Sequence, residues 1–333
     1  MNHRTLLSPT RDGWARRAWS TTLFIVAGLI SASPALAQNA ITFVVATTPG
    51  TGVDILARVI GKQITANRGT TVVVDTRPGA SGNIGAEHVA RAKPDGTILL
   101  VAATTFATNA VLNASNLPYN PVKDFTPIAL LGTGALCLVV PASFPANTLQ
   151  EFIAAARAKP GSINYASPGN GTPQHLAMEL VKLEAGIDLF HVPYKGTGGA
   201  LTDVAGGHVS AMIAPIHTVT PLASAGKLKV LAIMSPERFS GMPNVPTFKE
   251  LGLPNVQVDV WYGLFAPAGT APAAIAQLNK DVNLALKGNG VAQSLAKQGI
   301  VPAGGDPQIL ARKLQLELDR WPPIIKVAHI TAD

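Results

Sequence analysis

The sequence predicts an α/β protein with two lobes. Apolar runs of strand length alternate with amphipathic stretches of helical length, and this alternation is typical of parallel βαβ units in an open sheet. Glycine-containing loops follow several of the expected strands, and the last third of the chain changes to helix. A chain of 333 residues is long enough for two lobes of ordinary domain size.

The expected elements follow from short β-branched runs and helical periodicity. The strands are ITFVVA, TVVVDT, TILLVAA, ALCLVV, INYAS, LFHVPY, SAMIA and KVLAIM. The helices between them are expected at about 54–67, 84–92, 149–158, 173–184 and 200–205. Near the C-terminus, Pro272 precedes one helical pattern, and Asp306-Pro307 begins another that carries Leu310, Leu314, Leu318 and Trp321.

The N-terminus has the features of a secretory signal peptide. Four arginines precede a short apolar segment at 23–30, and the small-residue motif Ala35-Leu36-Ala37 follows. The apolar segment is too short to cross a bilayer permanently. We therefore expect cleavage after Ala37 and exclude residues 1–37 from the fold.

Composition excludes several classes of function. The formal net charge is +7, but Lys and Arg are scattered and never form a run, so we expect no nucleic-acid partner. Cys137 is the only cysteine and lies in the apolar run ALCLVV, which makes an intramolecular disulfide impossible and a buried thiol the simplest interpretation. No segment after the signal peptide is apolar for long enough to span a membrane.

Two glycine-containing loops are candidate anion sites. In the first, Pro49, Gly50 and Gly52 follow a strand and precede a helix that starts near Asp54. The unpaired N–H groups and the dipole of a helix N-terminus bind anions without charged side chains. The second loop runs from 167 to 171, followed by Thr172 and Pro173 at a helix start. Each loop alone is also compatible with a structural βα turn, but two facing lobes would enclose a small anion.

Other motifs are weaker. The glycines of GASGNIG are spaced three and three, which does not fit a dinucleotide fingerprint. His175 and Glu179 lack a second pair of metal ligands, so a structural role is favoured. Ser167 resembles a nucleophile after a strand, but Pro168 lacks the N–H that an oxyanion hole would need. We expect no enzymatic activity, no cofactor and no metal; a secreted α/β hydrolase is the less favoured alternative.

Eight ordered blocks resemble the Bug family of periplasmic solute-binding proteins, the receptors of tripartite tricarboxylate transporters. They are PGTGVDILAR, VVDTRPGASGNIGAE, KPDGTILL, LPYNPVKDFTPIALL, INYASPGNGTPQHLAMEL, HVPYKGTGGALTD, AGKLKVLAI and WYGLFAPAGT. The resemblance implies a periplasmic, monomeric, type II binding protein of the Venus-flytrap form with hinged lobes. Lobe I would comprise 38–139 and 262–333, lobe II would comprise 140–261, and the crossovers would lie near 139–140 and 262–264.

The resemblance also implies how a ligand is held. Family members bind small carboxylates mainly through backbone amides and ordered waters in the first and second loops. The residues expected to bind the ligand are Thr48, Thr51, Gly52, Val53, Thr104, Thr105, Ser167, Asn170, Gly171, Thr172, Ala214 and His217. The width of the pocket would depend on Phe106, Trp261 and Tyr262.

The chain departs from the family pattern in two places. Thr51 and Val53 replace a glycine and a threonine of the usual first loop, and Ala214-Pro215 stands where an acidic residue is common. Loss of that carboxylate disfavours an amino-bearing ligand, because a buried amine would lack a partner. We expect a di- or monocarboxylate, aromatic ones included. Its partner would be the membrane subunits of the transporter or, alternatively, a membrane sensor kinase for which the chain is a periplasmic co-receptor.

Overall fold

The structure is a computed structural model that describes residues 40–330. The predicted signal peptide and its cleavage site lie outside the described residues. Among the residues described, no helix combines the length and the apolar character that crossing a bilayer requires.

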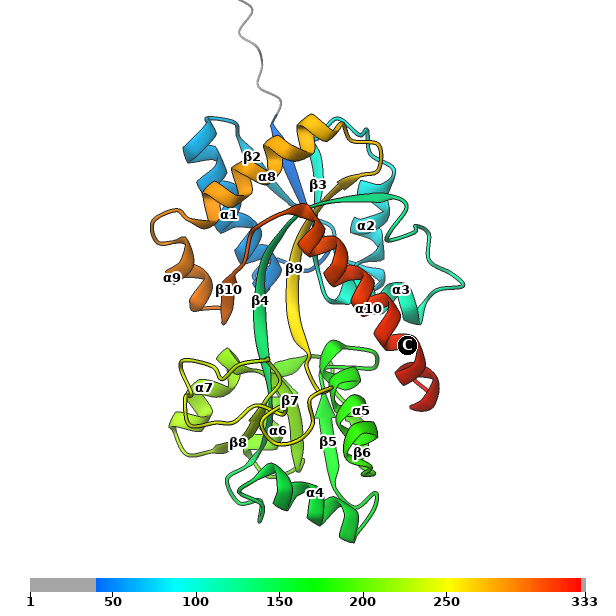
Figure 1. Cartoon of the computed structure of the whole chain (residues 1–333), viewed down its shortest axis with the longest axis vertical. Helices are drawn as coiled ribbons and strands as arrows, with labels where there is room; N and C mark the ends of the chain where they lie inside the picture. Colours follow the sequence, from blue (N-terminus) through cyan, green and yellow to red (C-terminus); the bar gives the residue numbers. More distant parts are fainter. Residues whose placement is uncertain (1–39, 331–333) are drawn as a thin grey trace, which may run out of the picture. The chain divides into compact units, whose positions relative to one another are not determined.

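Two sheets form the framework, and they share one long strand (Figure 1). Sheet A has the order β2-β1-β3-β9-β4, with β10 on β4; β1, β2 and β3 are parallel, and β9 and β4 are antiparallel to their neighbours. Its strands are β1 (Ile41–Val45), β2 (Val72–Thr76), β3 (Ile98–Ala103), β4 (Phe125–Pro141), β9 (Asp259–Pro267) and β10 (Ile300–Pro302).

Sheet B has the order β4-β7-β5-β6, with β8 also paired to β4. Strands β5, β6 and β7 are parallel to one another, and β4 is antiparallel to β7 and β8. The additional strands are β5 (Asn164–Ser167), β6 (Phe190–Pro193), β7 (Ala211–Pro215) and β8 (Leu228–Ile233). We call the part built on sheet A lobe I and the part built on sheet B lobe II.

The predicted α/β, two-lobed fold is confirmed, and the longest strand differs from its prediction. The run ALCLVV is the second part of the 17-residue strand β4. Phe125 to Ala135 pair with β9 in sheet A, whereas Leu136 to Pro141 pair with β7 and β8 in sheet B. β4 therefore changes sheets between Ala135 and Leu136. The domain boundaries inferred from the resemblance stay a prediction.

Helices pack against both sheets (Figure 1). They are α1 (Gly52–Arg68), η1 (Ala80–Gly82), α2 (Asn83–Ala90), α3 (Thr105–Leu112), α4 (Leu149–Ala158), α5 (Pro173–Ala185), α6 (Thr197–Ala205), α7 (Ile216–Ser224), α8 (Pro272–Leu286), α9 (Val291–Ala296) and α10 (Pro307–Val327). Sequence patterns had not indicated α3, α7 and α9. All three are short, with six to nine residues, so each has too few turns for a clear helical period.

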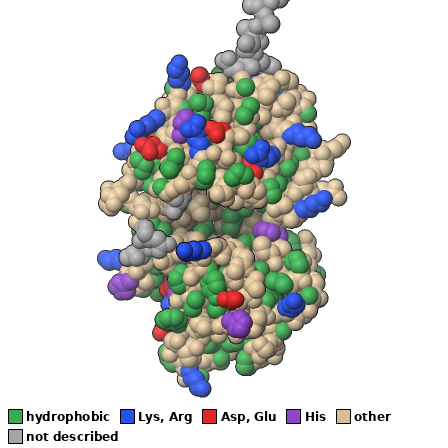
Figure 2. Space-filling view, turned by 180° about the vertical axis from the view of Figure 1, so that it is seen from behind, with side chains coloured by type: hydrophobic (Ala, Val, Ile, Leu, Met, Phe, Trp, Pro, Cys, Tyr) green, Lys and Arg blue, Asp and Glu red, His purple; other side chains and the backbone are tan. Residues whose placement is uncertain are grey.

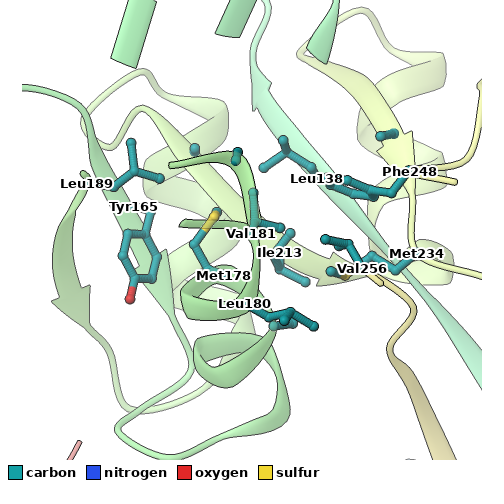
Figure 3. Packing of buried hydrophobic residues seen from close by; sticks show 14 of the residues in the cluster. Leu138, Tyr165, Met178, Leu180, Val181, Leu189, Ile213, Met234, Phe248 and Val256 are labelled. Carbon is teal, nitrogen blue, oxygen red and sulfur yellow. The ribbon is translucent and has the colours of Figure 1, made fainter. Parts of the chain in front are cut away.

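Each lobe has apolar clusters on both faces of its sheet. In lobe II, Tyr165, Met178 and Phe248 belong to a large cluster in which α5 packs against sheet B (Figure 3). Cys137 lies in the other cluster of that lobe, where it is fully buried, and its Sγ donates to the Ala214 carbonyl at 3.5 Å. Burial raises the pKa of the Cys137 thiol, as expected for an inert core cysteine.

The last helix, α10, runs along both lobes (Figure 1), and its side chains belong to the cores of both. Leu310 and Leu314 lie in a lobe I cluster, while Trp321 and Ile324 lie in the large lobe II cluster. Between these two ends, polar side chains of α10 contact the segment that enters β9. Lys313 Nζ lies 2.5 Å from Asp259 Oδ1, and Arg320 Nη1 donates to the Gln257 carbonyl at 2.6 Å. Within α10 itself, Trp321 Nε1 donates to Glu317.

Candidate functional site

The first loop, between β1 and α1, leaves a helix N-terminus without a side-chain cap. The N-cap residue Thr51 turns its hydroxyl away from the helix: Oγ1 donates to the Thr48 carbonyl at 3.0 Å and lies 2.8 Å from Thr47 Oγ1. The first backbone bond of α1 runs from the Ile55 N–H to the Thr51 carbonyl. Within residues 40–330, no group accepts a hydrogen bond from the N–H groups of 52–54. This N-terminus can therefore bind an anion.

Tyr262 adds a hydroxyl donor at the same place. The residue lies in β9 and is only 9 % exposed. A Cβ built on Gly52 would lie 3.5 Å from Tyr262 Oη, so the hydroxyl lies beside the first turn of α1. Burial raises the pKa of Tyr262 to about 12, which keeps the proton on Oη at neutral pH.

Asp54 fixes the conformation of loop one, and its negative charge does not prevent the loop from binding an anion. Although burial raises its pKa, hydrogen bonds from Arg58 and from the Gly50 N–H outweigh that effect and lower the pKa below the usual value. Its Oδ2 accepts from Gly50 N at 2.9 Å and from Arg58 Nε at 3.1 Å, and Arg58 Nη2 lies 2.9 Å from Oδ1. Asp54 Oδ1 nevertheless lacks a well-oriented hydrogen bond. The carboxylate is thus ionised, and the Arg58 guanidinium offsets its charge.

Hydrogen bonds and stacked rings beneath the second loop, between β5 and α5, fix its conformation. Ser167 is fully buried; its Oγ lies 2.7 Å from His191 Nε2 and 3.0 Å from the Gly169 carbonyl oxygen. The Gly171 N–H donates to His175 Nδ1 at 3.1 Å. The two histidine rings stack with centroids 3.9 Å apart, and His191 also stacks on Tyr165. These contacts shape the loop, and ligand contact by Ser167 stays a prediction.

The two loops are less alike than the sequence suggested. In α5 the Thr172 hydroxyl caps the His175 N–H at 3.4 Å, and Pro173 has no N–H to offer. The start of α5 therefore presents fewer free donors than the start of α1. Asn170 and Thr172 are half-buried, and Gly171 is buried. A Cβ on Gly171 would lie 2.2 Å from Leu112 Cδ1 of α3, so the loop contacts lobe I at this glycine.

The remaining predicted residues divide into supporting and lining positions. Thr104 is fully buried, and its Oγ1 accepts from the Trp261 N–H at 2.8 Å, which ties β3 to β9. Thr105 is exposed and lines a cavity of lobe I. Ala214 is fully buried in β7. Ligand contact by any of these residues stays a prediction.

His217 lies in the first turn of α7, against lobe I. A Cβ on Gly299, which precedes β10, would lie 2.4 Å from His217 Nδ1, so the imidazole packs on that backbone. Burial lowers the pKa of His217 below its ordinary 6.5. The ring is therefore neutral at pH 7 and offers a hydrogen bond, not a positive charge.

Acid should destabilise the protein in part through His217. Because the folded pKa lies below the unfolded value, this group's contribution is fully present above about pH 6.5 and is lost as the pH falls toward the folded pKa. We expect the His217→Asn variant to lose less thermal stability between pH 8 and pH 5 than the wild type does. Melting curves across that range provide the measurement. Identical pH dependence in both proteins would contradict it.

A small cavity of about 20 Å³, room for about one water molecule, lies beneath loop one in lobe I. We call it the α3 cavity; it is lined by Ala46, Thr47, Val53, Gly82, Ala86, Leu100, Val101, Ala102, Ala103, Thr105, Phe106, Asn109 and Tyr119. Its lining joins the ends of β1 and β3 to α2 and α3. The cavity is thus at the carboxyl ends of parallel strands, where open α/β sheets bind ligands.

Sequence reasoning had named Phe106 and Tyr262 only as residues that set pocket width. The hydroxyl of Tyr262 beside Gly52 depends on the pairing of β9 with β3, which brings Tyr262 opposite Ala103. Asn109 and Tyr119 were missed, because one lies on a helix that the pattern did not indicate and the other in a loop. No grouping of His, Cys, Asp and Glu among the described residues could hold a metal ion. On the face in Figure 2, Lys and Arg side chains are scattered.

Comparison with known proteins gives consistent matches over nearly the whole described chain. A family model described as "Tripartite tricarboxylate transporter family receptor" matches residues 56–330. The protein BugT of Bordetella pertussis is 32% identical over 316 residues, which are 92% of this chain and 97% of that protein.

Two solved structures with bound ligands are similar. Rpa4515 of R. palustris, solved with adipate, has a TM-score of 0.75 and 32% identity, and the match covers 88% of this chain and 98% of that chain. MatC (Rpa3494) of Rhodopseudomonas palustris, solved with bound malate, has a TM-score of 0.72 and 34% identity, and the match covers 86% of this chain and 98% of that chain.

Proposed function

Because this chain belongs to the tripartite tricarboxylate transporter receptor family, we propose that it is a periplasmic receptor that captures a small carboxylate between its lobes. It delivers this solute to the membrane subunits of a tripartite tricarboxylate-type transporter. The receptor acts as a monomer, and hinge motion closes the lobes around the ligand.

One observation carries the assignment of the ligand class. The first turn of α1 combines three N–H groups without acceptors, the positive end of a 17-residue helix, and the protonated hydroxyl of Tyr262. Such an arrangement stabilises one negative group by directed hydrogen bonds and a helix dipole. Adipate and malate in two similar structures support a carboxylate as that group.

The residues have distinct roles in this proposal. The backbone at Gly52 and Val53 binds the carboxylate, and Thr48 and Thr51 shape loop one. Asn170, Gly171 and Thr172 face the rest of the ligand from loop two, which Ser167 supports. Each hydrogen bond to the charged group contributes about 1.5–3 kcal/mol. A few of them account for micromolar affinity, which corresponds to about 8 kcal/mol.

Calorimetric titration tests the proposal. The purified protein is refolded to remove any bound solute and is titrated with aliphatic and aromatic mono-, di- and tricarboxylates and with their amides. We expect micromolar binding of at least one acid and no binding of its amide, because the amide lacks the charge. Equal binding of acid and amide, or no binding by a folded sample, would contradict a carboxylate receptor.

Tyr262→Phe is expected to weaken carboxylate binding without unfolding the protein. The substitution removes one hydroxyl donor to a charged group, which corresponds to about 1.5–3 kcal/mol, or a roughly 10- to 150-fold higher Kd. Stability should change little, because only the hydroxyl is removed and the ring stays in its lobe I cluster. Titration calorimetry and melting curves give the two readouts. An unchanged Kd would remove Tyr262 from the site.

A further inference from the structure

We propose that His175 is the positioning residue of loop two: it holds Gly171 in the conformation that packs against Leu112 of lobe I when the lobes enclose a ligand. This inference rests on the proposed function, since it concerns how the lobes close around the carboxylate. It goes further by giving a buried histidine, for which the sequence favoured only a structural role, a part in ligand capture. His175 acts through Gly171 and does not itself bind the ligand.

Gly171 is a point at which the two lobes meet. It lies in loop two of lobe II, whereas Leu112 is the last residue of α3 in lobe I. A Cβ on Gly171 would lie 2.2 Å from Leu112 Cδ1, so only a bare backbone can approach the leucine this closely. The φ of Gly171 is 65°, which glycine adopts without strain. The position of this backbone therefore decides how loop two packs against lobe I.

One hydrogen bond from His175 fixes that backbone. The buried Gly171 N–H donates to His175 Nδ1 at 3.1 Å. Because Nδ1 accepts here, the ring proton lies on Nε2. The Gly171 N–H is thus engaged inside lobe II, whereas the N–H groups of 52–54 in loop one have no acceptor within residues 40–330. Loop one supplies donors to an anion, and at Gly171 loop two supplies a fixed surface.

The His175 imidazole is itself held in place. It is 5 % exposed and stacks on His191, with centroids 3.9 Å apart and planes inclined by 14°. The His175 N–H donates to Thr172 Oγ1 at 3.4 Å, and His191 Nε2 lies 2.7 Å from Ser167 Oγ. The stacked pair therefore holds the start of loop two at Ser167 and its end at Gly171. A loop that is fixed before binding loses less entropy when the lobes close.

Two substitutions of His175 separate its acceptor from its bulk. His175→Leu keeps a buried side chain but removes the acceptor, whereas His175→Asn keeps one, because Asn Oδ1 lies as many bonds from Cα as His Nδ1 does. The refolded full-length mature protein is titrated with adipate, malate and benzoate by calorimetry. We expect His175→Leu to raise the Kd of the bound acids at least about tenfold and His175→Asn to stay within about threefold of the wild type. Equal Kd values in the two variants would overturn the inference.

Met178→Ala on the same helix is the matched control for stability. Met178 is fully buried in the large lobe II cluster, so its truncation should lower the melting temperature. We expect the Kd to stay unchanged. If Met178→Ala weakened binding as much as His175→Leu does, loss of stability would be the cause and the inference would fail. If the folded wild type bound none of the acids, the proposed function would fail as well.

A double-mutant cycle tests the path through Leu112. Leu112→Ala removes the lobe I side of the contact, so the effect of His175→Leu on Kd should shrink to less than about threefold in that background. Two residues that act on binding independently would instead give additive effects. Additive effects would show that His175 does not act through the contact between Gly171 and Leu112.

Nitrogen-15 NMR of the histidine rings tests the hydrogen bond without any ligand. Wild-type protein labelled at histidine is compared with labelled His175→Asn, in which the signal of this ring is missing. We expect a neutral His175 ring with its proton on Nε2 at neutral pH. A proton on Nδ1 would remove the acceptor for the Gly171 N–H and would overturn the inference, whichever acids bind.

Discussion

Replacing Gly52 with leucine is expected to abolish carboxylate binding while the protein stays folded. The new side chain would start 3.5 Å from Tyr262 Oη and would fill the space in front of the first turn of α1. At least two charge-assisted hydrogen bonds would be lost, or about 3–6 kcal/mol, which corresponds to a roughly 10²- to 10⁴-fold rise in Kd. Titration calorimetry with the best carboxylate measures the effect.

The melting temperature decides how this loss is interpreted. Gly52 is half-buried and its φ lies outside the left-handed region, so leucine fits the backbone. Ala271→Leu provides the control, because it adds similar bulk at the exposed N-cap of α8, away from loop one. Binding should survive in the control. Retained affinity in Gly52→Leu would refute the site, and a large drop in its melting temperature would make misfolding the cause.

Trp321→Ala should produce the largest loss of stability. The indole is fully buried in the lobe II cluster, so truncation leaves a cavity and costs about 3–5 kcal/mol of unfolding free energy. It also removes the hydrogen bond that Trp321 Nε1–H donates to Glu317. Burial already raises the pKa of this carboxyl group. Urea unfolding followed by circular dichroism would report the change.

Leu316→Ala on the same helix is the matched control. Its side chain is 59 % exposed, so we expect a change within about 0.5 kcal/mol. If Trp321→Ala were as mild as this control, α10 would not be part of the lobe II core. The comparison separates core packing from helix propensity, because both variants introduce alanine into α10.

The α/β class and the uncapped helix N-terminus after the first glycine loop could be predicted, because both leave local signals in the sequence. The run ITFVVA, the glycines of loop one and the apolar positions of α1 all lie within about 25 residues of one another. Thr172 and Pro173 likewise mark the start of α5, as observed. Val53, Thr105 and Phe106 of the α3 cavity were named from the sequence, but its other residues could not be found in this way. The lining comes from loop one, α1, η1, α2, β3, α3 and the loop that holds Tyr119, and only tertiary packing brings these parts together.

Two predicted site residues have hydrogen-bond partners that local reasoning did not indicate, and their contact with a ligand stays a prediction. Ser167 ends β5 and Thr104 follows β3, and their hydroxyls are hydrogen-bonded to His191 and to the Trp261 N–H respectively. A sequence gives the position of a polar side chain along a strand, whereas its partner depends on long-range pairing. The same holds for Tyr262, whose hydroxyl reaches Gly52 from more than 200 residues away.

The path of α10 has a consequence for the order of folding. Lobe II lacks Trp321 and Ile324 until the final helix has been made, and lobe I lacks Leu310 and Leu314. A chain that is synthesised or exported from its N-terminus cannot complete either core until its last 25 or so residues are free. Contacts so distant in sequence also slow folding, because the intervening chain must close first. Because α10 completes both cores, the chain stays incompletely folded until α10 is in the same compartment as the rest of the chain.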